Sequence, residues 1–182
     1  KQHLELTRNI AERFNGIYGQ TFKVPDPYIP KVGAKIMSLQ DPTRKMSKSD
    51  ENVNSYVALL DKPDDIMRKF KRAITDSDAQ VRYGEGKDGI NNLMGIYSVM
   101  TGKTNEEIER EFDGKGYGDF KLAVGEAVVD HLRPIQEEFT RLIGDKAYLE
   151  QCYTKSAEIA LRISQRTLDK AMKKVGFVKR AF

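Results

Sequence analysis

The sequence predicts a mainly α-helical fold, in which a short α/β segment to about residue 53 precedes a helical bundle that continues to the C-terminus. Apolar residues recur at helical spacing through most of the chain after Asn91, up to a stop at Gly176. Before residue 53, in contrast, one amphipathic helix is followed by short apolar runs bounded by prolines and glycines.

The first segment predicts a helix, because charged residues separate its apolar ones at helical intervals. Residues 21–24 form a strand candidate that ends at Pro25. A helix followed by a strand is typical of the last unit of an open nucleotide-binding sheet. Five further helices are expected to begin near residues 63, 93, 104, 120 and 147, and Pro134 should kink or split the fourth of them.

Composition favours a globular protein in a reducing compartment such as the cytoplasm. The chain is 39% hydrophobic and 32% charged, without an apolar run of membrane-spanning length and without a signal-peptide pattern. A single cysteine, Cys152, excludes an internal disulfide. The net charge of +4 is uneven, because residues 145–182 hold nine Lys or Arg against four Asp or Glu. That excess favours a polyanionic partner at the C-terminal end.

Residues 41–50 form the most informative stretch, a turn-bounded loop with three cations and two hydroxyls in six residues. Lys45 and Lys48 carry compact ammonium groups on flexible stems, which suit contact with phosphate oxygens. Such charges can offset the charge that develops on a departing pyrophosphate. The alternative is a solvated surface turn, which leaves the apolar Met46 between two lysines without a purpose.

A second informative segment, residues 30–39, precedes this loop. Gly33 permits close approach of a ligand to the backbone, and residues 35–38 can form a brief strand. Ile36 and Met37 could offer a flat apolar seat to an adenine ring. From the residues alone, the two are better explained as core strand residues.

Lys45-Met46-Ser47-Lys48-Ser49 resembles the KMSKS signature of class I aminoacyl-tRNA synthetases. The flanking residues 30–40, 71–78 and 81–83 make the chain similar to the bacterial tryptophanyl-tRNA synthetases. The resemblance implies that residues 1–53 are the C-terminal part of a Rossmann-like catalytic domain. It also implies that residues 54–182 are a helical domain of the type that binds the tRNA anticodon.

The resemblance further implies a site for ATP, a substrate that arrives with Mg²⁺ and needs no metal ligand from the protein. Lys45 and Lys48 would be catalytic through the phosphates, Ser47 and Ser49 would support the loop, and Ile36 and Met46 would border the adenosine. The whole enzyme would join tryptophan to tRNA(Trp) as a cytoplasmic homodimer.

Two features of the family are not found in this sequence. Neither His3 nor His131 lies in a His-x-Gly-His context, and the Asp-Gln pair of the tryptophan pocket is expected just before Lys1. We therefore expect the chain to be the C-terminal half of an enzyme and to be inactive alone.

A second candidate site lies near the C-terminus. Four cations recur every four residues and would form one stripe on a helix: Arg162, Arg166, Lys170 and Lys174. The stripe could follow the tRNA backbone, and it could equally be a solvated face.

Two alternatives to this function stay open. One is a non-enzymatic helical RNA-binding module in which the loop only contacts phosphate. The other is a synthetase for tyrosine, because the residues that choose the amino acid are not in this sequence. Two motifs are set aside. Asp76 and Asp78 lack a His or Cys partner for a metal, and residues 84–89 lack the spacing of a phosphate-binding loop.

Overall fold

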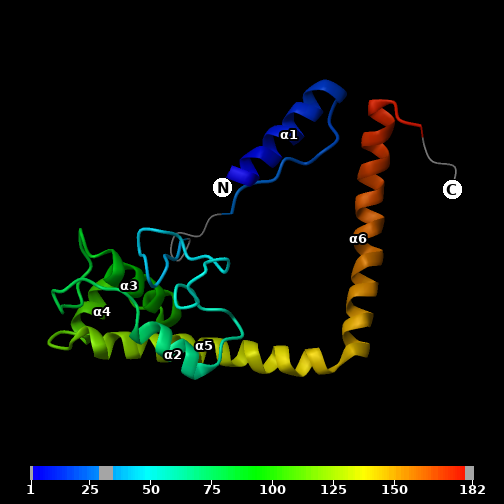
Figure 1. The fold of residues 1–182 in the computed structure, drawn as a ribbon. Helices are drawn as coiled ribbons and strands as arrows, with labels where there is room; N and C mark the ends of the chain where they lie inside the picture. Colours follow the sequence, from blue (N-terminus) through cyan, green and yellow to red (C-terminus); the bar gives the residue numbers. More distant parts are fainter. Residues whose placement is uncertain (1, 29–34, 179–182) are drawn as a thin grey trace. The chain divides into compact units, whose positions relative to one another are not determined.

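The computed structural model describes residues 2–28 and 35–178, and within them the chain forms six helices (Figure 1). These are α1 (Gln2–Tyr18), α2 (Pro63–Lys71), α3 (Asp88–Thr101), α4 (Asn105–Glu111), α5 (Tyr117–Gly144) and α6 (Lys146–Val175). The mainly α-helical prediction is confirmed. No helix in the described part of the chain is long and apolar enough to cross a membrane.

The chain divides into two compact units. One is formed by both ends of the sequence, Lys1–Ile29 and Leu142–Phe182, and contains α1 and α6. The other is the continuous stretch Pro30–Arg141, which contains α2, α3, α4 and most of α5. The predicted domain boundary at residue 53 concerns a larger catalytic domain and stays a prediction.

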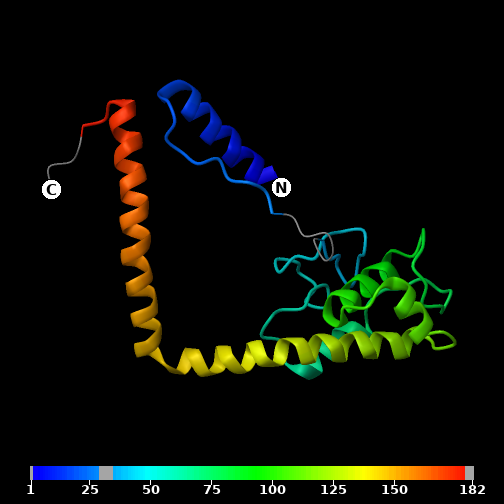
Figure 2. The same ribbon diagram turned by 180° about the vertical axis from the view of Figure 1, so that it is seen from behind.

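The middle unit has a well-packed core, and α2, α3 and α4 gather around the first part of α5 in both views (Figure 1, Figure 2). The rings of Tyr97, Phe112 and Phe120 meet edge to face with centroids 4.9 to 5.8 Å apart. Gly125 lets α2 approach α5 closely, because a Cβ there would lie 2.8 Å from the sulfur of Met67.

The helix ends follow from local sequence signals. Thr104 and Glu107 form a reciprocal capping box at the start of α4. Gly176 ends α6 in the left-handed conformation with φ 90°. Pro134 lies inside α5, which is one helix from Tyr117 to Gly144, so the predicted split does not occur. The lost main-chain bond at one residue is tolerated within a helix of 28 residues.

The predicted strand at residues 21–24 is wrong, because a side chain satisfies its main-chain groups. Asn15 Oδ1 accepts hydrogen bonds from the N–H groups of Thr21 and Phe22, each over 2.9 Å, and its Nδ2 donates to the Phe22 carbonyl over 2.8 Å. Strand pairing in the described residues is limited to one isolated antiparallel bridge between Met37 and Lys45.

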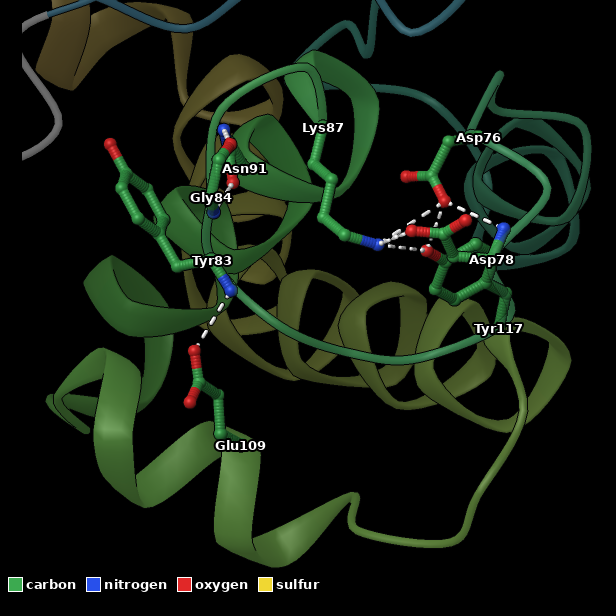
Figure 3. A network of polar contacts seen from close by, with 8 residues as sticks. All are labelled: Asp76, Asp78, Tyr83, Gly84, Lys87, Asn91, Glu109 and Tyr117. Carbon is green, nitrogen blue, oxygen red and sulfur yellow. Dashed lines mark hydrogen bonds and ion pairs between the residues drawn. The ribbon is translucent and has the colours of Figure 1, made fainter.

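A polar network fixes the connection between α2 and α3 (Figure 3). The ammonium group of Lys87 lies 2.8 Å from the Asp78 carboxylate and 3.4 Å from that of Asp76. Tyr117 of α5 donates to Asp76 over 2.5 Å. Burial would raise the pKa of Asp76, but the bonds from Tyr117, the Asp78 amide and Lys87 outweigh it and lower that pKa. The Asp76 carboxylate is therefore held ionised, and it joins this connection to α5.

We expect Asp76→Asn to lower the free energy of unfolding by about 1–2 kcal/mol at pH 7, because it removes the charge that Tyr117 and Lys87 contact. Since folding lowers the pKa of Asp76, its contribution is complete above a pH of about 4 and is lost as the pH falls through the folded-state pKa. Denaturant titrations at pH 7 and pH 3 measure the difference. Asp113→Asn, at an exposed carboxylate, is the control and should change stability little. An equal loss for Asp76→Asn at both pH values would contradict the prediction.

Candidate functional site

The charged loop includes the turn and the second side of a short hairpin, in which residues 36–38 pair with residues 44–46, and it ends in a further turn at residues 47–50. The Ser38 N–H donates to the Arg44 carbonyl over 2.8 Å, and the Met46 N–H donates to the Ile36 carbonyl over 3.0 Å. Between these two bonds, Met37 lies directly opposite Lys45. The brief strand predicted around Met37 therefore exists as a single bridge, and it holds the first lysine of the loop.

Asp41 shapes the turn that joins the two sides of the hairpin. Its carboxylate accepts hydrogen bonds from the Thr43 hydroxyl over 2.6 Å and from the Thr43 N–H over 3.1 Å. Both bonds lower the pKa of Asp41, the hydroxyl bond more strongly. The Arg44 N–H donates to the Asp41 carbonyl over 3.0 Å and closes the turn. The turn therefore brings the chain back so that Arg44 and Met46 pair with residues 36–38.

The turn end of the hairpin is joined to the core of the middle unit through Leu39. This residue is 2% exposed. Its N–H donates to the Ser55 carbonyl over 2.9 Å, and its carbonyl accepts from the Ile74 N–H over 2.8 Å. One buried residue thus connects the hairpin with the segment that follows the loop and with the end of α2.

The predicted ATP-binding residues fall into two groups on this hairpin. Ile36 and Met46 are half-buried and pack against the core. Lys45, Ser47, Lys48 and Ser49 are exposed. Ser47 accepts a hydrogen bond from the Ser49 N–H through its hydroxyl, and its carbonyl accepts from the Asp50 N–H; both distances are 3.2 Å. The apolar residues thus anchor the loop, while its polar residues face solvent.

Neither Lys45 nor Lys48 forms an ion pair within the described residues, which leaves both ammonium groups available to a ligand. A cavity of about 310 Å³ lies beside the hairpin. Ile36, Met37 and Pro42 line one side of it, and Asn92 and Ile96 of α3 line another. The site can therefore offer a polyanion two unpaired cations close to an apolar surface.

The four cations of the predicted basic stripe differ in their contacts. Arg162, Arg166 and Lys170 are exposed on α6 and form no ion pair within the described ranges. The Lys174 ammonium donates to the carbonyls of Gly19 and Gln20 over 2.8 and 3.1 Å, in the same unit. These carbonyls follow the end of α1, where a cation is favourable. Lys174 thus has a structural contact that its spacing did not indicate.

The described residues contain no group of three or more His, Cys, Asp or Glu side chains that could hold a metal ion. The carboxylates of Asp76 and Asp78 both contact Lys87.

Comparison with known sequences places the chain in a family. The family model described as tRNA synthetases class I (W and Y) matches residues 1–133. The chain belongs to this family. The matched residues 1–133 include the Lys45–Ser49 loop, whereas the basic stripe lies beyond them.

Two similar relatives are tryptophan–tRNA ligases. The ligase of Wolinella succinogenes is 52% identical over 178 residues, which is 98% of this chain and 54% of the relative. That of Clostridium tetani is 51% identical over 98% of this chain and 53% of the relative. The chain therefore spans about half the length of the curated relatives it matches.

Solved structures agree with this assignment. The tryptophanyl-tRNA synthetase of Mycoplasma pneumoniae superposes with a TM-score of 0.87 at 29% identity, over 97% of this chain and 54% of that one. The tryptophanyl-tRNA synthetase of Campylobacter jejuni in complex with ADP and tryptophan has a TM-score of 0.68 at 23% identity, over 97% of this chain and 54% of that one. This likeness supports the fold alone.

Sequence reasoning did not identify the side chains that hold the loop from outside. Asn92 of α3 bonds to both main-chain groups of Met37, and the adjacent Asn91 bonds to both main-chain groups of Gly84. The visible signal was a pair of amides at the start of an otherwise apolar helical pattern. Nothing in the spacing indicated which distant segments they contact.

Proposed function

We propose that this chain forms the C-terminal portion of a tryptophan–tRNA ligase and carries its pyrophosphate-contacting loop. The observation that carries this proposal is the pair of exposed lysines without an ion pair in the described residues, Lys45 on the hairpin and Lys48 just after it, in a chain 52% and 51% identical to two tryptophan–tRNA ligases. The whole protein would use ATP with its Mg²⁺, tryptophan and tRNA(Trp), act in the cytoplasm, and form a homodimer.

The proposed first step is adenylate formation. A carboxylate oxygen of tryptophan attacks the α-phosphorus of ATP, a new O–P bond forms, and the bond to the β-phosphate bridging oxygen breaks. Pyrophosphate leaves with the electron pair of that bond, so negative charge grows on its oxygens. Lys45 and Lys48 would offset this growing charge with two ammonium groups and would not need to donate a proton. In the second step, a 3′-terminal hydroxyl of the tRNA attacks the adenylate carbonyl and AMP leaves.

The adenosine would lie against Ile36 and Met46, whose half-buried side chains form the apolar part of the hairpin. Ser47 and Ser49 would maintain the tight turn through the bond between the Ser47 hydroxyl and the Ser49 N–H. Because Met46 packs against the core while Lys45 and Lys48 are exposed, the lysine side chains can turn toward the phosphates without unpacking the core.

ATP–pyrophosphate exchange on the whole protein, with each of the twenty amino acids, tests this function. We expect exchange that depends on tryptophan, and none when the 182-residue chain is assayed alone. Exchange that depends on tyrosine instead would contradict the proposed specificity for tryptophan. Exchange with no amino acid, together with retained RNA binding, would favour a non-enzymatic RNA-binding module.

In the whole protein, Lys48→Ala should slow adenylate formation by about 10² to 10³-fold, because one of two charges on the departing pyrophosphate is lost. The affinity for ATP should change much less, since that charge develops only as the bond breaks. Single-turnover kinetics separate the two effects. Lys71→Ala, at an exposed lysine of α2, is the matched control and should leave the rate unchanged. A wild-type first-step rate in Lys48→Ala would remove Lys48 from the mechanism.

The basic stripe is proposed to contact the tRNA backbone through Arg162, Arg166 and Lys170, the three of its cations for which the described part of the chain provides no ion pair or hydrogen-bond partner. A triple variant in which Gln replaces Arg162, Arg166 and Lys170 should bind tRNA(Trp) more weakly. It should also reduce the slope of log affinity against log salt by about 3, one for each lost phosphate contact. Pyrophosphate exchange without tRNA should not change.

Lys146→Gln provides the comparison for the stripe variant, because Lys146 lies nearly opposite the stripe on α6. An unchanged salt slope in the triple variant would show that the stripe is a solvated face.

A further inference from the structure

The edge of the hairpin that faces away from the loop has an unusual partner. The bonds from Ser38 to Arg44 and from Met46 to Ile36 flank the Met37–Lys45 bridge. In an antiparallel pair with this pattern, the N–H and C=O of the central residue point away from the opposite strand. The main-chain groups of Met37 therefore need partners on the outer edge, where a next strand would normally supply them.

Asn92 supplies both partners. Its Oδ1 accepts the Met37 N–H over 2.9 Å, and its Nδ2 donates to the Met37 carbonyl over 2.9 Å. One side-chain amide thus takes the place of a neighbouring strand. Since the amide extends from α3, it ties the position of the hairpin to a helix whose inner residues Leu93 and Met94 are fully buried.

We propose that Asn92 is a positioning residue for the Lys45–Ser49 loop in adenylate formation. The inference rests on the proposed function. Asn92 does not approach the phosphates; it fixes Met37, which lies directly opposite Lys45, and so sets where the lysines of the loop begin. Without the amide, the outer edge of Met37 loses both of its protein partners, and that side of the hairpin keeps its attachment at Leu39 and Gln40 and the packing of Ile36. A small displacement of a charged group in a transition state costs up to about 10²-fold in rate.

Asn91 provides a matched control on the same helix. Its Oδ1 accepts the Gly84 N–H over 3.0 Å, and its Nδ2 donates to the Gly84 carbonyl over 2.6 Å (Figure 3). Both asparagines are half-buried in the first turns of α3, and both hold one residue by two bonds. Gly84, however, lies in the connection before α3 and forms no main-chain bond to the hairpin.

The test compares Asn92→Asp with Asn91→Asp in the whole protein. Aspartate keeps the size and the acceptor but loses the donor, so each variant removes the same kind of bond. We expect Asn92→Asp to lower the rate constant for adenylate formation at saturating ATP and tryptophan by at least about tenfold, with a change below about threefold in the KM for ATP. Asn91→Asp should stay within about threefold of wild type, although its loss of thermal stability should be similar.

Hydrogen exchange supplies a readout that is independent of catalysis. The amide hydrogens of Ser38 and Met46 should exchange faster in Asn92→Asp than in wild type. In Asn91→Asp they should exchange at the wild-type rate. Should Asn92→Asp fail to fold, Asn92→Ser keeps a smaller polar group there, and we expect the same direction at lower magnitude.

Equal rate constants in the two variants, or a wild-type rate constant in Asn92→Asp, would overturn the proposal. If the wild-type protein showed no tryptophan-dependent exchange, the proposed function would fail. The amide exchange of Ser38 and Met46 would still decide whether Asn92 positions the hairpin, and unaltered exchange in Asn92→Asp would overturn that part.

Discussion

The requirement that main-chain polar groups find partners determines where the charged loop of this protein lies. A hairpin with one bridge has few bonds of its own, and two of them join residues 36–38 to residues 44–46. The remaining groups on the Met37 side are taken by Asn92, and those of Leu39 by Ser55 and Ile74. An exposed, cationic segment can therefore stay attached at a defined place while its lysines remain free of ion pairs within the described residues.

This arrangement separates two demands that compete at phosphate sites. Lys45 and Lys48 must be free of acidic partners within the protein, because an ion pair would have to break before each cation could meet a ligand. The apolar Met46, which lies between them in the sequence, packs against the core, whereas both lysines are exposed to solvent. Because buried and exposed side chains alternate along this segment, Met46 anchors it to the core while Lys45 stays available to a ligand.

Local signals in the sequence were enough to predict much of the fold. Helical spacing located the helices after residue 62, Thr104 indicated the capped start of α4, and Gly176 indicated the end of α6. The loop itself was predicted from its unusual density of lysine and serine, which depends on no distant contact. Its identity as a family signature came from resemblance, and the family is confirmed over residues 1–133.

The features that could not be predicted depend on which main-chain groups a polar side chain meets, from six residues away to more than 150. Asn15 replaces a strand at residues 21–24, Asn92 replaces one beside Met37, and Lys174 contacts carbonyls more than 150 residues away. A polar side chain of this kind can face solvent, cap a helix or bond to the backbone. Its position in the sequence pattern is the same in all three cases, so the pattern does not distinguish them. Only the fold decides between these outcomes.

The division of the chain also affects the order in which it can fold during synthesis. Residues 30–141 are continuous, so every contact within that unit is available once its own stretch has left the ribosome. The unit that contains α1 also needs residues 142–182, which follow the middle unit in the sequence. Translation therefore delivers the hairpin and its supporting helices before the segment that completes the unit of α1.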